Sequence, residues 1–109
     1  MITLRPMQAT QADYLHMQRW FHEPELQGEP PVSVARIAEK YGPRAAHPTD
    51  VFPYFILKDG DPIGFIQYYI HSEEAIGLDM WIGVPDARSR GCGSEALRQM
   101  VDVIHRNHP

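Results

Sequence analysis

A chain of 109 residues is long enough for one domain and too short for two of ordinary size. Its net charge of −4 argues against a nucleic-acid-binding protein, and its one cysteine excludes an internal disulfide. No apolar run approaches the roughly 20 residues that a membrane helix needs, and no signal peptide is evident. We therefore expect one cytoplasmic domain over residues 1–109, with neither a nucleic-acid nor a membrane partner.

The first half of the sequence predicts one strand and two helices. "ITLRP" alternates apolar and polar residues, which predicts a strand closed by Pro6. Thr10 can cap a following helix, whose apolar residues at roughly helical spacing are Ala12, Leu15, Trp20 and Phe21. After a proline-rich break, a short helix is predicted from Val34 to Tyr41, ended by Gly42-Pro43, and residues 42–53 read as a loop.

The second half predicts strands followed by a helix. Asp59-Gly60 lies between two apolar runs and is a strong hairpin signal, and "EAIGLDMWIGV" (residues 74–84) predicts a further strand. From Ser94 onward, apolar residues recur at helical spacing: Ala96, Leu97, Met100, Val101 and Ile104. The order β-α-α-β-β-β-α predicts a mixed α/β (α+β) domain with a central antiparallel meander.

The stretch "RSRGCGSEAL" (residues 88–97) joins the last strand to the last helix. Gly91 and Gly93 let successive backbone N–H groups converge on an anion, and the helix N-terminus adds unpaired donors. The two arginines add countercharge, and Ser94 can cap the helix or bond a phosphate oxygen. Taken alone, the pattern fits equally well a phosphate cradle or a glycine turn with solvated arginines.

In context, Arg88-x-x-Gly91-x-Gly93 after a strand and before an amphipathic helix resembles the coenzyme A pyrophosphate motif of the GCN5-related N-acetyltransferases (GNAT). "PYFILKDGDPIGFIQYY", "GLDMWIG" and "RGCGSEALRQMVDVI" look like the aminoglycoside 6′-N-acetyltransferase branch, as does "ITLRPMQATQADYLHMQRWF". The resemblance covers nearly the whole chain. It implies a GNAT-like mixed sheet and acetyl transfer from acetyl-CoA to a primary amine of an aminoglycoside-like acceptor.

The resemblance also implies where acetyl-CoA would bind. The strand over residues 76–84 would splay from its neighbour, so that pantetheine lies in the gap, with backbone contacts from Ile82 and Val84. The residues implied to hold the diphosphate are Arg88, Ser89, Arg90, Gly91, Cys92, Gly93 and Ser94. For Cys92, the backbone N–H is expected to matter, since no partner that would activate the thiol can be placed beside it.

Four residues are candidates for the acceptor site. Asp79 is the one acid in an apolar strand, where a carboxylate is costly unless it is paired or functional. The resemblance implies that Asp79 anchors the ammonium group and acts as general base; the alternative is a solvent-facing aspartate. Gln67 and Tyr69 share one face of their strand and can line the same site, with packing as the alternative for the tyrosine. Trp20 is a candidate pocket wall for a cation or a core residue.

The six histidines form no recognisable ligand set, so no metal is expected. Members of the superfamily continue beyond the helix that ends here near Arg106, with another strand, a helix and closing strands. Without them, the strand over residues 76–84 would keep an unpaired edge, so we expect a homo-oligomer or a complementing segment, and weak or lost activity. The alternatives are a lysine or siderophore N-acyltransferase, and a non-catalytic remnant that binds CoA or a partner.

Overall fold

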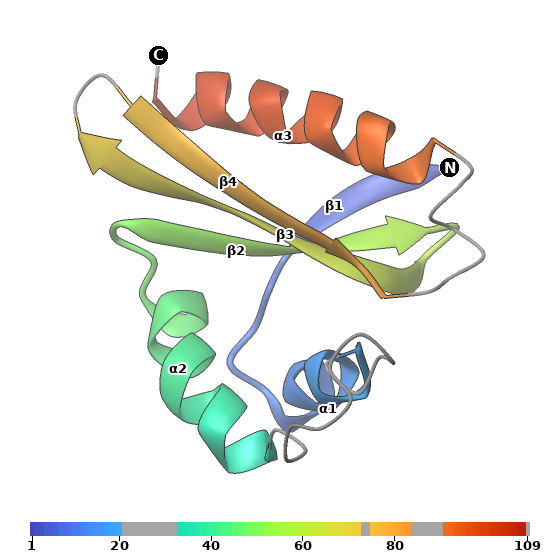
Figure 1. The fold of residues 1–109 in the computed structure, drawn as a ribbon, viewed down its shortest axis with the longest axis vertical. Coiled ribbons are helices and arrows are strands. Elements are labelled where there is room, and N and C mark those ends of the chain that lie inside the picture. Colours follow the sequence, from blue (N-terminus) through green and yellow to red (C-terminus); the bar gives the residue numbers. More distant parts are fainter. Residues whose placement is uncertain (21–32, 73–74, 84–90, 109) are drawn as a thin grey trace, which may run out of the picture.

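The computed structural model describes residues 1–20, 33–72, 75–83 and 91–108 of the chain. A twisted sheet separates α3 on one face from α1 and α2 on the other (Figure 1). The order of elements confirms the predicted one, with these bounds: β1 (Ile2–Pro6), α1 (Gln11–Trp20), α2 (Val34–Ala46), β2 (Val51–Lys58), β3 (Asp61–Ser72), β4 (Ala75–Ile82) and α3 (Cys92–Asn107).

The sheet is a meander in the order β1-β2-β3-β4, and each neighbouring pair is antiparallel. The hairpin between β2 and β3 turns at Asp59 and Gly60, with φ values of 51° and 89°. Two successive positive φ values are what a type I′ hairpin turn requires, so the Asp-Gly prediction is confirmed. Within the described residues, β4 pairs only with β3 and therefore forms one edge of the sheet.

The core lies in two layers because the central strands are covered on both faces. Phe55 and Ile56 are neighbours in β2, yet both are fully buried, since adjacent residues of a strand point to opposite faces. On the α3 face, Ile56 packs in a cluster that includes Ile66, Tyr68, Ala96 and Met100. On the other face, Phe55 packs in a cluster that includes Met17, Trp20, Ile37 and Phe65.

Helix α2 is longer than predicted and continues past Tyr41. Ser33 caps its start by accepting a hydrogen bond from the N–H of Arg36, and the helix runs through Gly42 and Pro43 to Ala46. A Cβ at Gly42 would lie 2.9 Å from Oη of Tyr14, so this glycine allows α1 to approach α2 rather than ending the helix. The predicted loop over residues 42–53 is therefore helix at its start and strand β2 from Val51.

Helix α1 buries Trp20, as predicted, but its other buried residues differ from the predicted ones. Leu15 is 46% exposed, whereas the buried residues are Asp13, Tyr14, Met17 and Trp20. The carboxylate of Asp13 is satisfied because it accepts two hydrogen bonds from the guanidinium of Arg5, at 3.0 and 3.1 Å. Phe21, which the sequence assigns to this stripe, lies outside the described residues.

Helix α3 begins two residues earlier than predicted, at Cys92, with Gly91 as its N-cap. Ser94 lies inside the first turn, and the helix has no side-chain capping bond, so the capping role predicted for Ser94 is wrong. Ala96 and Met100 are fully buried, but Leu97 and Val101 are each 41% exposed. Among the described helices, none is both long and apolar enough to cross a membrane.

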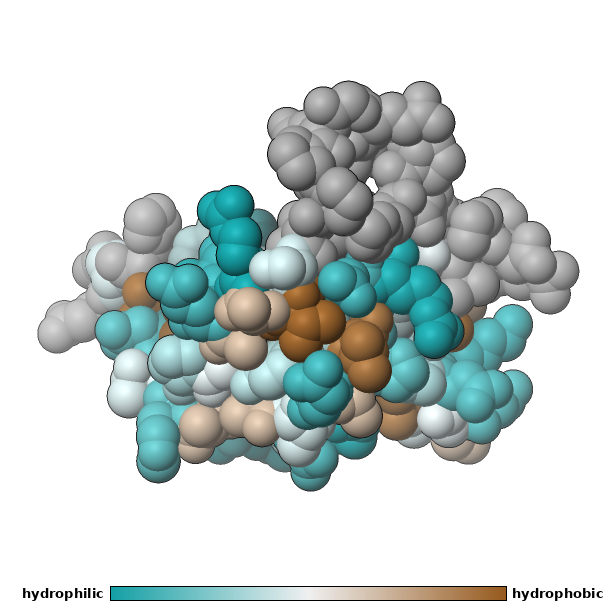
Figure 2. All heavy atoms as spheres, turned by 90° about the horizontal axis from the view of Figure 1, so that it is seen from below, coloured by the Kyte–Doolittle hydropathy of each residue, from teal (hydrophilic) through white to brown (hydrophobic). Residues whose placement is uncertain are grey.

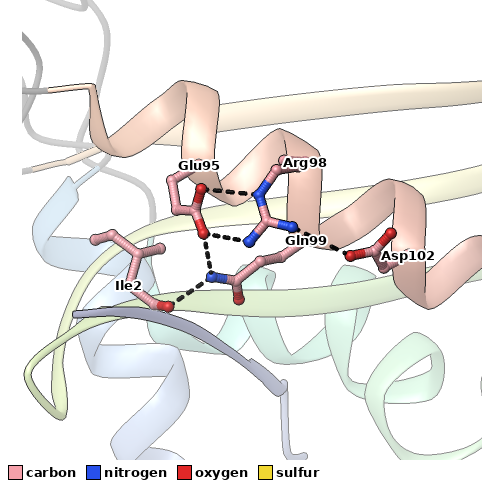
Figure 3. A network of polar contacts seen from close by, with 5 residues as sticks. All are labelled: Ile2, Glu95, Arg98, Gln99 and Asp102. Atoms are coloured by element: carbon pink, nitrogen blue, oxygen red, sulfur yellow. Dashed lines mark hydrogen bonds and ion pairs between the residues drawn. The ribbon is translucent and has the colours of Figure 1, made fainter.

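A polar network on α3 ties this helix to β1 (Figure 3). Arg98 donates hydrogen bonds to Glu95 and Asp102, and Gln99 donates to Glu95 and, at 2.6 Å, to the carbonyl of Ile2. The hydrogen bonds from Arg98 and then from Gln99 lower the pKa of Glu95 to about 2. The charged form of Glu95 is therefore favoured in the folded chain.

Replacing Glu95 with Gln should lower the free energy of unfolding at pH 7. The folded pKa of Glu95, about 2, lies below its usual value of 4.5, so the stabilisation is present above pH 4.5 and disappears as the pH falls toward 2. Urea denaturation of wild type and Glu95→Gln across this range should give a difference that shrinks with acidification. Because the pair is exposed, about 1 M salt should shrink the difference as well. A difference independent of pH would contradict the account.

Candidate functional site

A pocket of about 420 Å³ lies where α2 meets the ends of the central strands. Its wall comes from four elements and the segment before β2: Lys40, Tyr41, Arg44, Asp50, Val51, Gln67, Tyr69, Ile70 and Asp79. Three of the predicted acceptor-site residues thus lie in one pocket. A larger hollow, of about 970 Å³, lies between β1 and the second half of α3 and contains none of the predicted site residues. Figure 2 shows the molecule from below, relative to the view of Figure 1. On this side, the surface of the described residues is largely hydrophilic and surrounds a small apolar area.

The central feature of the pocket is a pair of side chains on adjacent strands. The β3–β4 register places Gln67 directly opposite Asp79, and Nε2 of Gln67 donates a hydrogen bond to Oδ2 of Asp79 at 3.0 Å. Gln67 is only 7% exposed and so has a fixed position, whereas Asp79 is exposed to the pocket side. One carboxylate oxygen is therefore oriented by the amide, which leaves the other available to a ligand.

The structure leaves the carboxylate of Asp79 exposed, as in the alternative of a solvent-facing aspartate. β4 is an edge strand whose residues are mostly exposed. Asp79 therefore needs no compensation for burial. What distinguishes Asp79 from a solvated surface acid is its neighbours. Gln67 donates a hydrogen bond to it from β3, and Tyr41 of α2 lines the same pocket.

Two tyrosines shape the pocket beside this pair. Tyr69 lies over Gly77, where a Cβ would come within 2.1 Å of the tyrosine ring, so the glycine makes room for the ring. Burial raises the pKa of Tyr41, while the charge of Arg44 lowers this pKa and the charge of Asp79 raises it. The hydroxyl of Tyr41 is therefore close enough to sense both a guanidinium and a carboxylate.

The beginning of α3 lies against the opposite face of β4. Gly91 has a φ of 74°, and the N–H groups of Cys92, Gly93 and Ser94 have no partner within their own helix. A Cβ on Gly93 would lie 3.2 Å from Cε of Met80, so the helix start packs closely on β4, one residue along from Asp79. Cys92 is 4% exposed, which suits a small packed residue rather than a nucleophile.

The rest of the predicted cofactor-binding set is only partly described. Gly83 donates to the carbonyl of Ile63 on β3, at 2.8 Å. Because alternate residues of an antiparallel strand face opposite edges, the N–H of Ile82 points toward the outer edge of β4. Four predicted residues lie outside the described part of the chain: Val84, Arg88, Ser89 and Arg90.

Trp20 is placed by the structure in the core. It is 4% exposed, and its ring packs edge-on against Phe55 with 5.4 Å between centroids. A Cβ on Gly83 would lie 2.1 Å from Cδ1 of Trp20, so the indole covers the residue that follows β4. Trp20 does not line the pocket. Its indole packs against Gly83, the residue that follows β4.

Sequence reasoning missed the contribution of α2. Lys40, Tyr41 and Arg44 lie within one turn of each other and line the pocket wall that faces the strands. The signal in the sequence is a basic-aromatic cluster, Lys40-Tyr41 followed by Arg44. The sequence predicts that the helix ends before Gly42, so that Arg44 would not share a helix face with Lys40. The cluster becomes apparent only because α2 continues to Ala46.

Several solved structures share this fold. An aminoglycoside acetyltransferase, AAC(6')-Ib in complex with coenzyme A, superposes with a TM-score of 0.79 at 23% identity, over 97% of this chain and 68% of that one. An acetyltransferase from Thermus thermophilus gives 0.76 at 19% identity, over 93% and 68%. A spermidine N-acetyltransferase chimera, from Vibrio cholerae SpeG and hSSAT, gives 0.73 at 16% identity, over 92% and 60%.

At these identities the likeness establishes the fold and not the acceptor. Among curated protein sequences, none matches this chain significantly. The family model of the acetyltransferase (GNAT) domain, however, matches residues 1–108, which is almost the entire chain. The β-α-α-β-β-β-α order and the glycine-capped helix after β4 agree with that match. This chain therefore belongs to the GNAT acetyltransferase domain family.

Proposed function

We propose that this chain transfers the acetyl group of acetyl-CoA to a primary amine bound in the pocket at Asp79. The observation that carries the proposal is the arrangement around β4. Asp79 is held by Gln67 on one face, and the next residue, Met80, touches the start of α3 on the other. An anion-binding helix start and an ammonium-binding carboxylate thus lie on two faces of one edge strand.

The reaction needs a neutral amine, because a protonated amine has no lone pair with which to attack. A primary amine with a pKa near that of lysine, ~10.4, arrives protonated at neutral pH. Asp79 binds the ammonium ion and accepts its proton, directly or through water, while Gln67 keeps the carboxylate in position. The amine nitrogen then forms a bond to the acetyl carbon and the carbon–sulfur bond breaks. The leaving thiolate takes up the second proton, which the nitrogen loses as the amide forms.

The backbone around α3 suits the diphosphate of CoA. Gly91 carries no side chain that would block an approaching phosphate, and no described residue lies within 4 Å of its Cβ position. The first N–H groups of the helix and its positive dipole end favour an anion there. Acetyl-CoA supplies the activated acetyl group, and we propose backbone contact to it from Ile82 and Val84 as well.

Aminoglycoside-like amines are the acceptors that the solved relatives suggest first. Two similar structures are complexes with kanamycin and with ribostamycin, and another relative is a spermidine N-acetyltransferase chimera. What these molecules share is a primary amine, for which an oriented carboxylate is a suitable partner.

A thiol-release assay tests the proposed function. The chain is mixed with acetyl-CoA and with single amines, including kanamycin, spermidine and amino acids, and free thiol is followed with time. We expect release that depends on both acetyl-CoA and an amine, with an acetylated amine as product. Release at the same rate with and without amine would contradict a transferase function.

We further propose that a second copy of the chain covers the outer edge of β4. The exposed apolar side chains of this edge and of the adjoining side of α3 are 36–44% exposed: Ile76, Leu78, Met80, Leu97 and Val101. An antiparallel pairing of two β4 strands about a two-fold axis would place both sets on one face of a continuous sheet, where they would bury each other.

Light scattering at several concentrations tests this pairing. We expect a dimer for the wild type and a monomer for Leu78→Lys, because a charge cannot be buried unpaired at such an interface. Leu15→Lys is the matched control, since Leu15 is 46% exposed on α1, away from β4. A wild type that stays monomeric at high concentration, or a control that dissociates equally, would refute the dimer.

A further inference from the structure

The pocket contains two cations for which the proposed transfer has no use. Lys40 and Arg44 both line the pocket from α2, whereas Asp79 lines it from β4. Nζ of Lys40 and Cζ of Arg44 each lie 5.4 Å from the centroid of the Tyr41 ring. Within the described residues, neither of these cations forms an ion pair, so both are available to an anionic group of a ligand.

The charges in the pocket are separated by a tyrosine. Lys40 and Arg44 flank Tyr41 on the same turn of α2, and the hydroxyl of Tyr41 feels the charges of both Arg44 and Asp79. A ligand that reaches Asp79 with its amine therefore meets Arg44 further along the same pocket. Asp50 also lines the wall, so the pocket has two acids and two bases although the chain as a whole carries a net charge of −4.

Charge balance of this kind disfavours a polycation. An acceptor with more ammonium groups than the two acids of the pocket would place at least one of them near Arg44 or Lys40, where like charges repel. An acceptor with one amine and one anionic group would instead form an ion pair at each end. Arginine in particular binds carboxylate and phosphate groups through two parallel hydrogen bonds.

The size of the pocket is that of a small-molecule site. A volume of about 420 Å³ lies within the roughly 300–1,000 Å³ range of such sites. The pocket has room for an amine and an anionic group of one ligand at the same time.

We propose, on the basis of the transferase function proposed above, that the acceptor is a small primary amine that also carries a carboxylate or a phosphate group. Its amine lies at Asp79, and its anionic group lies at Arg44 and Lys40. This arrangement makes Arg44 a specificity-determining residue rather than a participant in the acetyl transfer.

Calorimetric binding of matched ligands to the intact chain tests the proposal without requiring turnover. ε-Aminocaproate and cadaverine differ only in the group at one end, a carboxylate or a second amine. O-Phosphoethanolamine and ethanolamine form the phosphate pair, and kanamycin represents a polycation. We expect the anionic member of at least one pair to bind about tenfold more tightly, the size of one hydrogen bond to a charged group. The pair with the larger ratio identifies carboxylate or phosphate.

Arg44→Gln should remove that preference and leave the affinity for the purely cationic member equal or higher. Arg36→Gln is the matched control, because Arg36 is an exposed arginine of the same helix that does not line the pocket. Tighter binding of cadaverine or kanamycin, binding of none of the ligands, or an unchanged preference in Arg44→Gln would each overturn the proposal.

The outcome is distinguishable from a failure of the transferase function. If the anionic members bind preferentially but no thiol is released from acetyl-CoA, the transferase function is wrong and the ligand class of the pocket stands. If thiol is released and cadaverine is the better substrate and ligand, the function stands and the acceptor class is wrong.

Discussion

Replacing Asp79 with Asn should lower kcat/KM for acetyl transfer by about a hundredfold or more, the usual contribution of a positioned general base. The substitution preserves the size of the side chain, and the amide oxygen of Asn can still accept the hydrogen bond from Gln67. Only the negative charge and the proton acceptor are lost. The defect therefore reports on chemistry and not on folding, which thermal denaturation of the variant would confirm.

The pH dependence separates the two roles of Asp79. If Asp79 removes the proton from the ammonium ion, the defect of Asp79→Asn should shrink as the pH rises toward the pKa of the amine, where neutral amine is supplied by solvent. Asp61→Asn is the control, since Asp61 is an exposed acid at the hairpin, outside the pocket. Unchanged turnover in Asp79→Asn, or an equal loss in Asp61→Asn, would remove Asp79 from the mechanism.

Replacing Gly91 with Asp should weaken the binding of acetyl-CoA by about tenfold or more, because a carboxylate would lie beside the diphosphate. Gly91→Asn should bind acetyl-CoA much as the wild type does. Gly91 has a φ of 74°, and Asn and Asp are the residues other than glycine that best tolerate this region. No described residue lies within 4 Å of the Cβ position, so both variants should fold, with a similar loss of about 1 kcal/mol from the positive φ. The two variants then differ in the charge that faces an incoming diphosphate.

This comparison has an internal check, because a carboxylate at the start of a helix stabilises the helix dipole. Gly91→Asp should therefore be at least as stable as Gly91→Asn and yet bind acetyl-CoA less tightly. Calorimetry and thermal denaturation on the same samples measure both quantities. Equal affinities of the two variants for acetyl-CoA would show that no anion binds at the start of α3.

Local patterns in the sequence predict the strands and their facing residues well. The alternation of side chains along a strand places Gln67 and Tyr69 on one face, and the structure puts both beside Asp79. The Asp59-Gly60 turn fixes the β2–β3 hairpin because both residues adopt positive φ. Each of these predictions depends on residues close together in the chain, which is why the sequence alone is sufficient.

Features that depend on contacts between distant elements are not predictable in this way. Gly42 has the sequence signature of a helix end, although its role is to admit the ring of Tyr14 from α1. Asp13 does not stand out as part of the buried stripe of α1, because its partner Arg5 comes from β1. The basic wall of the pocket is hidden for the same reason, since only the longer α2 brings Arg44 to the strands.

The exposed stripe of α3 is a further case. Periodicity places Leu97 and Val101 among the apolar residues of the helix, but it cannot tell a face that meets the sheet from a face beside an open edge. The structure separates them, with Ala96 and Met100 buried on the sheet and Leu97 and Val101 exposed. This stripe is the basis of the proposed pairing at β4.

The most direct test of acetyl transfer at Asp79 is to follow an isotope label from acetyl-CoA into the amine. The chain is incubated with acetyl-CoA labelled in the acetyl group and with an amine of the class that binds the pocket, and the product is analysed by mass spectrometry. We predict a labelled amide on the primary amine with the wild type, and at most a trace with Asp79→Asn. Unlabelled amine after long incubation, with binding of both ligands verified, would contradict the account.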